Sequence, residues 1–258
     1  MDFSHVANNL RESFRILAGG REHGEVRELP GISIASAGVV FQMFNAAFLS
    51  APVKADAELT QRILMASLHF EARGLEWAYW VCEDWLEERV RRRSRKVFDK
   101  HGLRHSVDLP GMVAERLLPP VRPLPRLTVQ RVCNAATRDA FCSIGSTCFN
   151  VPISWFREVF EPAGVWERFA GYVGYAGGEA VSSAAVVFAE GMAGVYNVAT
   201  VPGHQHRGYG EAIVRHALEE ARKEHGVERT ILQSTRAGYA LYERMGYKTI
   251  TNVAVYST

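Results

Sequence analysis

Residues 205–210 read Gln-His-Arg-Gly-Tyr-Gly and lie between an apolar run and an amphipathic segment. The run 194–201 is β-branched and aromatic, as buried strands are, and Pro202 and Gly203 end it. In the stretch 211–223, apolar residues recur at the spacing of one helical face. The junction therefore predicts a glycine-containing loop that leads directly from a strand into a helix.

Such a loop is suited to hold a phosphate group. The first-turn amides of a helix have no internal partners, and the helix dipole is positive at that end. Gly208 and Gly210 lack a Cβ atom, so a pyrophosphate can come close to the main chain. We expect three or four amides to anchor a diphosphate, each charge-assisted bond contributing about 1.5–3 kcal/mol.

The spacing of the loop excludes two common nucleotide motifs and resembles a third. It contains neither Gly-Lys-Ser/Thr nor Gly-x-Gly-x-x-Gly. The pattern Gln-x-x-Gly-x-Gly, after a strand that ends in Val-Pro, resembles the acyl-CoA loop of the GNAT acyltransferase superfamily. Residues 229–233 are strand-like, and residues 239–247 resemble the family's fourth helix, in which a tyrosine (Tyr242) lies four residues before a Gly-aromatic pair. The resemblance covers residues 126–258.

The resemblance implies that an amine attacks the thioester carbon of an acyl-CoA, with acetyl-CoA as the co-substrate. Tyr242 is then the expected acid, since a phenol with a pKa of about 10 suits a thiolate of about 8.5; the alternative is a tyrosine that only packs in the core. A main-chain N–H within 199–201 is expected to stabilise the oxyanion, and Arg207 either adds a charge contact or is solvated. The predicted acyl-CoA contacts are Ala199, Thr200, Val201, Gln205, His206, Arg207, Gly208, Tyr209, Gly210, Glu211 and Ser234.

The sequence does not identify a general base. A lysine-like amine loses its proton at pH 7 at a cost of about 4–5 kcal/mol, which a base, a relay or a low-pKa amine must meet. Some relatives carry a carboxylate on the strand before the loop, and this strand has none. Glu190, Tyr196, Asn197 and His204 are nearby polar candidates, and a water relay is an equal alternative. His204 and His206 form an H-x-H pair without a third ligand, so no metal is predicted.

A proline-rich run divides the chain. Residues 117–126 hold four of the ten prolines, which favours an extended connector. We expect a domain at 1–116 and a catalytic domain at 127–258. The order of elements in the second domain, antiparallel strands first and βαβα later, predicts a mixed α/β sheet of GNAT type. Strands are expected at 39–49, 76–81, 127–132, 169–175, 181–188, 192–201, 229–233 and 248–256, and helices at 1–20, 55–70, from 84, 134–148, 152–161, 211–223 and 239–247.

The first domain repeats the later part of the second. The segments 97–103 and 241–247 both read apolar, aromatic, acidic, basic, any residue, glycine, apolar, and Phe44-Asn45-Ala-Ala matches Tyr196-Asn197-Val-Ala. We infer an internal duplication that resembles the tandem GNAT arrangement; an accidental match is the alternative, since helix ends often carry glycine. The first copy is degenerate, because residues 50–54 lack a glycine loop and Phe98 replaces the tyrosine.

Composition and charge narrow the functional classes. The 258 residues are 47% hydrophobic and 22% charged, with a net charge of +2, so neither nucleic acid nor a membrane is an expected partner. The four scattered cysteines and the lack of an apolar leader indicate reduced thiols in a cytoplasmic protein. The basic run 89–96 is read as a solvated helix face with the ion pairs Glu87–Arg91 and Glu88–Arg92.

Three functions remain open on the sequence. The first is an acetyl-CoA-dependent N-acyltransferase whose acceptor is a small-molecule amine or a peptide. The second is a non-catalytic acyl-CoA sensor, which the missing base keeps open. The third is an interaction protein that uses the basic helix, and acetyl-CoA binding separates it from the other two.

Overall fold

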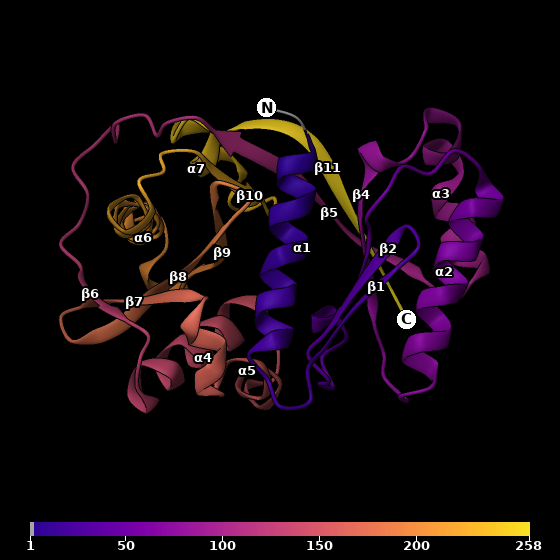
Figure 1. Ribbon diagram of the computed structural model, residues 1–258. Helices are drawn as coiled ribbons and strands as arrows, with labels where there is room; N and C mark the ends of the chain where they lie inside the picture. Colours follow the sequence, from indigo (N-terminus) through magenta and orange to yellow (C-terminus); the bar gives the residue numbers. More distant parts are fainter. Residues whose placement is uncertain (1–2) are drawn as a thin grey trace.

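The computed structural model describes residues 3–258, in which eleven strands form one mixed sheet with helices on both of its faces (Figure 1). The strands are β1 (Glu25–Leu29), β2 (Ile32–Ser36), β3 (Asn45–Leu49), β4 (Ala78–Cys82), β5 (Arg104–Ala114), β6 (Thr128–Arg131), β7 (Ala170–Ala176), β8 (Glu179–Ala189), β9 (Met192–Thr200), β10 (Thr230–Gln233) and β11 (Lys248–Ser257). The helices are α1 (Phe3–Gly19), α2 (Asp56–Glu71), α3 (Glu88–Lys100), α4 (Ala135–Phe149), α5 (Ile153–Phe160), α6 (Tyr209–His225) and α7 (Tyr239–Arg244). None of the helices in the described residues is long and apolar enough to cross a membrane.

The strand order is β1-β2-β3-β4-β11-β5-β10-β9-β8-β7-β6, so the two halves of the chain exchange strands at the centre. The last strand of the second half, β11, lies between β4 and β5 of the first half. In return, β5 lies between β11 and β10. Figure 1 shows β5 and β11 crossing the middle of the molecule side by side. We call the elements through β5 the N-terminal half and those from β6 onward the C-terminal half.

The mixed α/β sheet predicted from the sequence is confirmed, and so is the duplication. The succession β3–α2–β4–α3–β5 is repeated as β9–α6–β10–α7–β11, with parallel pairing of β3 with β4 and of β9 with β10. The helices α3 and α7, which occupy the same place in the two repeats, end in the same way. Leu103 N donates to Phe98 O at 3.1 Å, and Tyr247 N donates to Tyr242 O at 3.0 Å. The glycines before these two donors both have positive φ.

One predicted repeat match is wrong. Asn45 comes before the residues of β3 that pair with β4, which begin at Ala46. Asn197 comes after the residues of β9 that pair with β10, which end at Val195. The two asparagines therefore occupy opposite ends of the paired segments, and their sequence similarity does not reflect equivalent positions.

Two parts of the sheet were not predicted from the sequence: the β1–β2 hairpin and β5. In β5 the apolar signal is broken by charged residues, by Pro110 and by Gly111, which ordinarily argue against a central strand. Pro110 is tolerated because the ladder with β11 shifts register beside it, between Thr249 and Thr251. Its carbonyl accepts a hydrogen bond from Ser234 N at 2.9 Å. Residues 115–127 form neither helix nor strand, and the domain boundary within 117–126 stays a prediction.

In the N-terminal half, the segment equivalent to the glycine loop is closed by its own chain. The Glu58 carboxylate accepts from Lys54 N at 2.8 Å, where a phosphate oxygen would otherwise fit. Val53 bridges to the chain beyond β4, donating to Trp85 O at 2.7 Å. The buried Arg62 guanidinium pairs with Glu58 and donates to Pro52 O at 2.8 Å. These contacts occupy the groups that an anion would need.

Helix α1 lies across the middle of the sheet, between the two halves (Figure 1). Its fully buried Asn9 donates to Ala189 O at 2.9 Å and to Met192 O at 3.2 Å, the two sides of the β8–β9 turn. Tyr196 donates to Asn9 Oδ1 at 2.7 Å. Gly194 is required here, because a Cβ atom would lie 2.0 Å from Asn9 Oδ1. The helix thereby forms part of the wall facing β9.

Candidate active site

The predicted acyl-CoA residues gather around one cleft of about 700 Å³ beside the glycine loop. The cleft opens because β9 pairs with β10 only over residues 193–195 and then diverges from it. Eight of the eleven predicted acyl-CoA contacts and the predicted acid Tyr242 line the cleft; the eight are Ala199, Thr200, Gln205, His206, Gly208, Tyr209, Gly210 and Glu211. Val201, Arg207 and Ser234 do not line it; Ser234 is fully buried and donates to Thr235 O at 2.8 Å.

The loop has the backbone geometry that anion binding requires. Gly208 is the N-cap of α6 at φ +90°, a conformation that residues with a side chain rarely adopt. The helix bonds begin with Ala212 N donating to Gly208 O at 3.0 Å, so the preceding amides of the first turn lack helical partners. Gln205 fixes the loop to the end of β9, with Nε2 donating to Thr200 O at 3.0 Å. Its side chain therefore serves the loop rather than the ligand.

Two arginines that the sequence did not single out line the same cleft. Arg122 belongs to the proline-rich segment, and its Nη2 donates to His206 O at 3.3 Å. Arg244 comes from the end of α7. The buried Glu211 carboxylate is paired with Arg215 at 2.8 Å, which neutralises its charge near the amides. The proline-rich run was read as a connector, and its composition gave no sign that Arg122 faces a ligand cleft.

The backbone of β9 narrows the choice of an oxyanion donor. Val201 N donates to Val181 O at 3.0 Å, so it is not available to an oxyanion. Antiparallel pairing alternates the direction of successive amides, which turns those of Val198 and Thr200 away from β8 toward the cleft. Asn197, at φ +48°, forms the bulge that sets this alternation.

Cys148 lies beside one of these two amides. Burial raises the pKa of its thiol, and an interaction with the Thr200 backbone amide opposes part of that rise. A sulfur of the protein itself thus lies near the Thr200 amide. The amide of Val198, which the sequence analysis did not include, is left as the candidate oxyanion donor.

Tyr242 lies at the inner end of the cleft, on α7. Its side chain is buried, and its ring meets that of Tyr247 edge to face with the centroids 5.6 Å apart. Burial raises the pKa of the Tyr242 phenol above its ordinary value. The phenol therefore keeps its proton at neutral and mildly alkaline pH, as a proton donor must.

A second cavity, of about 350 Å³, adjoins the cleft from the side of the N-terminal half. Its walls come from α1, from the loop before β3, from β4 and β5, and from α4 to β10. Four residues line both the cavity and the cleft: Phe149, Val198, Thr235 and Tyr242. The candidate oxyanion donor and the candidate acid therefore stand where the two spaces meet. We call this second space the acceptor cavity.

The base candidates include one carboxylate and one imidazole, and neither of them lines the acceptor cavity. Glu190 occupies the β8–β9 turn at φ +55° and lines neither space. Tyr196 does line the cavity, but burial raises the pKa of its phenol and its hydroxyl donates to Asn9. His204 lines the cleft instead, with Nε2 3.8 Å from Glu179. Within residues 3–258 no group of three or more His, Cys, Asp or Glu could hold a metal ion.

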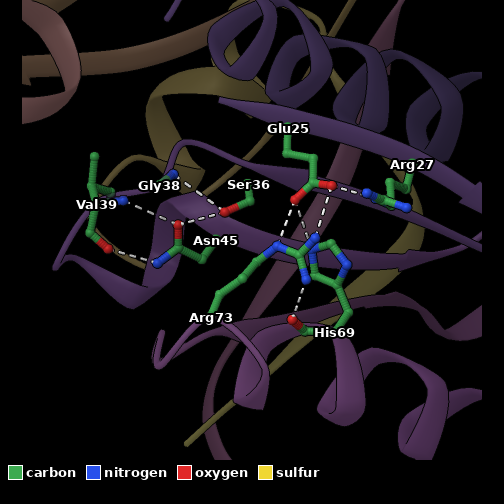
Figure 2. A network of polar contacts seen from close by, with 8 residues as sticks. All are labelled: Glu25, Arg27, Ser36, Gly38, Val39, Asn45, His69 and Arg73. Carbon is green, nitrogen blue, oxygen red and sulfur yellow. Dashed lines mark hydrogen bonds and ion pairs between the residues drawn. The ribbon is translucent and has the colours of Figure 1, made fainter. Parts of the chain in front are cut away.

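The loop that closes the acceptor cavity is held by one buried asparagine (Figure 2). Asn45 Nδ2 donates to Val39 O at 2.7 Å and to Glu76 O at 2.9 Å, and Ser36 Oγ donates to Asn45 Oδ1 at 3.0 Å. The loop between Ser36 and Asn45 carries three wall residues: Phe41, Met43 and Phe44. Figure 2 also shows the neighbouring pair of Arg73 and Glu25.

We expect Asn45→Ala to lower the free energy of unfolding by about 2–4 kcal/mol, because the buried Val39 carbonyl and the partly buried Glu76 carbonyl lose their donor. Ser36→Ala is the control: it removes one hydroxyl and leaves both carbonyls bonded, so its expected cost is about 1 kcal/mol. Urea denaturation measures both. Equal costs for the two variants would mean that the asparagine amide does not hold the loop.

The basic run follows the predicted pattern only in part. Arg92 pairs with Glu88, as predicted. Arg91 does not pair with Glu87 but with Asp84, at 3.4 Å, because the 3₁₀ turn before α3 brings that carboxylate alongside. Arg93 reaches Asp56 at 3.1 Å. The charges on this face are thus balanced by neighbouring acids.

Comparison with known proteins agrees with this geometry. Residues 165–249 match the model of the acetyltransferase (GNAT) domain. The C-terminal half carries a GNAT acetyltransferase domain. The match spans β7 to α7, which includes the glycine loop and Tyr242.

The whole fold has counterparts among solved structures. A GCN5-related N-acetyltransferase from Kribbella flavida is 19% identical, with a TM-score of 0.71 over 97% of this chain and 95% of that one. A conserved protein of unknown function from Staphylococcus epidermidis is 12% identical, with a TM-score of 0.66 over 91% and 94%. A GCN5-related N-acetyltransferase from Sphaerobacter thermophilus is 13% identical, with a TM-score of 0.59 over 88% and 76%. At these identities the likeness concerns the fold, and no match was found among curated proteins.

Proposed function

We propose that this GNAT protein transfers an acetyl group from acetyl-CoA to a primary amine by direct attack in a ternary complex. The observation that carries the proposal is the meeting of two spaces at Tyr242 and Val198. One space has a glycine loop suited to a phosphate, and the other has room for an acceptor. Direct transfer needs both substrates at one point, and this arrangement supplies it.

The diphosphate of CoA is placed on the first-turn amides of α6. Gly208 lets the backbone turn at the loop, and the helix dipole favours the negative charge there. Arg122 and Arg244 add positive charge at the rim. The pantetheine arm then follows the open edge of β9 toward Val198, which brings the thioester to the junction.

At the junction the reaction follows from the groups present. The amine nitrogen forms a bond to the thioester carbon, and the carbonyl oxygen becomes an oxyanion that accepts from Val198 N–H. The C–S bond then breaks, and the electron pair leaves on sulfur. Tyr242 gives its hydroxyl proton to the thiolate, and the proton lost by the nitrogen restores the phenol through water. The products are the N-acetyl amine and free CoA.

A non-catalytic acyl-CoA sensor is the second candidate, because no carboxylate or histidine is among the residues that line the acceptor cavity. A sensor would bind acetyl-CoA without turning it over. The two functions therefore share the cleft and differ only in acceptor-dependent chemistry.

Release of free thiol from acetyl-CoA, measured with a thiol reagent across a set of amines, tests the proposal. We expect release that depends on the amine and is accompanied by an N-acetyl product of the matching mass. Tight binding of acetyl-CoA without release for any amine would favour the sensor. Absence of acetyl-CoA binding would contradict both functions.

A further inference from the structure

The acceptor cavity has walls of a distinct chemistry. Among the described residues, those that line it include no Asp, Glu, Lys, Arg or His. Six phenylalanines line it, from α1, the loop before β3, α4, α5 and the residue before β7, together with Trp80 and two tyrosines. An ammonium group would find no carboxylate on such walls, only the attraction of aromatic faces, of about 0.5–2 kcal/mol, and it would lose its hydration on entering.

The missing base points in the same direction. A protonated alkylamine needs a group that takes its proton before attack, and the lining of the cavity offers no carboxylate or imidazole. An amine that is already neutral at pH 7 needs no such group. An amino group conjugated to an aromatic ring has this property, and its flat ring suits walls built from aromatic side chains.

Two polar groups in the cavity lack a partner. Gln233 Nε2 and Trp80 Nε1 are both buried, and neither has a hydrogen-bond partner within residues 3–258. Both residues line the cavity, Gln233 at the end of β10 and Trp80 on β4. Buried donors are ordinarily satisfied. Both nitrogens are closed to solvent, so an acceptor oxygen of an occupant completes either of them once its side chain turns toward the cavity.

We propose that the acceptor is an uncharged aromatic amine that carries an oxygen substituent on the ring. This inference rests on the proposed acetyl transfer and names the substrate class of the same site. The ring occupies the apolar walls, the oxygen accepts from Gln233 or Trp80, and the amino group faces the thioester beside Tyr242. The nitrogen attacks with its free electron pair, and the C–S bond breaks. The proton that the nitrogen loses replaces the one that the departing thiolate takes up. No further reactant is required.

Binding is measured by calorimetry with the CoA-bound protein, so that the result does not depend on turnover. At pH 7 we expect 4-methoxyaniline to bind at least a hundredfold more tightly than spermidine or kanamycin. It should bind at least tenfold more tightly than 4-methoxybenzylamine, which has the same ring but a protonated amine. It should bind at least threefold more tightly than 4-ethylaniline, which lacks the oxygen.

Each comparison has an outcome that would overturn part of the inference. Spermidine or kanamycin binding as tightly as 4-methoxyaniline would overturn the aromatic class, and equal binding of the benzylamine would overturn the uncharged amine. Equal binding of 4-ethylaniline would overturn the oxygen contact. If no amine binds, while hexanoyl-CoA binds more tightly than acetyl-CoA, the cavity holds an acyl chain and the inference is wrong.

A pair of variants tests the role of charge directly. Met43 is half-buried and lines the cavity, and a glutamate of similar length would place a carboxylate on the wall. We expect Met43→Glu to tighten spermidine binding at least tenfold, whereas Met43→Gln keeps the order of affinities found in the unaltered protein. Unchanged spermidine binding in the glutamate variant would contradict the argument from charge.

The same ligands separate this inference from the proposed function. Thiol release with kanamycin but not with 4-methoxyaniline would leave the transferase in place and remove the aromatic acceptor. Binding of 4-methoxyaniline without thiol release would support the aromatic occupant of the acceptor cavity and contradict the proposed acetyl transfer.

Discussion

Gly208→Ala is expected to weaken acetyl-CoA binding by about ten- to a hundredfold while the protein stays folded. An alanine is disfavoured at φ +90°, and its Cβ atom would lie 3.1 Å from Pro125 Cδ. The loop must then shift, and the amides at the start of α6 lose their common direction. Loss of one charge-assisted bond of about 1.5–3 kcal/mol accounts for an effect of this size.

The opposite end of the same helix supplies a matched control. Gly226 is the C-cap of α6 at φ +69°, and no atom lies within 4 Å of where its Cβ would stand. Gly226→Ala therefore brings a comparable backbone strain, of about 1–2 kcal/mol, far from the cleft. Calorimetric titration should show weaker acetyl-CoA binding for Gly208→Ala than for Gly226→Ala. Thermal unfolding should show similar losses of stability for the two variants. Equal affinity in both would show that the phosphate is bound elsewhere.

The glycine loop could be predicted from the sequence because its cause is local. The end of a strand, two glycines and an amphipathic helix determine the backbone within a few residues, and Gly208 and Gly210 both line the cleft as expected. The helix end at Tyr242 is equally local, since the glycine after it sets the turn. The same segments matched the family model.

The acceptor cavity could not be predicted in this way, because its walls come from distant parts of the chain. Phe14 on α1, Trp80 on β4 and Leu109 on β5 meet Tyr196 of β9 only because the halves exchange strands. No spacing along the sequence records that exchange. The strand β5 itself was missed, since its proline and its charges hide a central strand whose neighbours supply most of the pattern.

The absence of a base and the choice of donor amide also depend on tertiary geometry. The sequence placed the oxyanion donor within 199–201, whereas the bulge at Asn197 directs the amide of Val198 into the opening. A single inserted residue reverses which amides face the neighbouring strand. Bulges of this kind leave little trace in the residue pattern, so the sequence could give the strand but not the amide.

Tyr242→Phe is expected to lower kcat by about a hundredfold or more, with acetyl-CoA affinity changed by less than about twofold. The phenylalanine keeps the ring packed against Tyr247 and removes only the hydroxyl at the junction of the two spaces. The departing thiolate then has no proton donor beside it, whereas the diphosphate contacts on the distant loop remain. Steady-state kinetics and calorimetry together measure this separation of turnover from binding.

Tyr247→Phe is the control for the loss of a buried hydroxyl. That residue is also a buried tyrosine, but its hydroxyl is hydrogen-bonded to Thr230 Oγ1 at 2.9 Å and its side chain lines neither space. Its replacement should cost about 1 kcal/mol of stability and leave kcat within about twofold. If the two variants lose turnover equally, the effect belongs to the packing of α7, and Tyr242 is a core tyrosine. If only Tyr242→Phe loses it, the hydroxyl acts on the leaving sulfur, because both substitutions remove a buried tyrosine hydroxyl and only Tyr242 lines the two spaces.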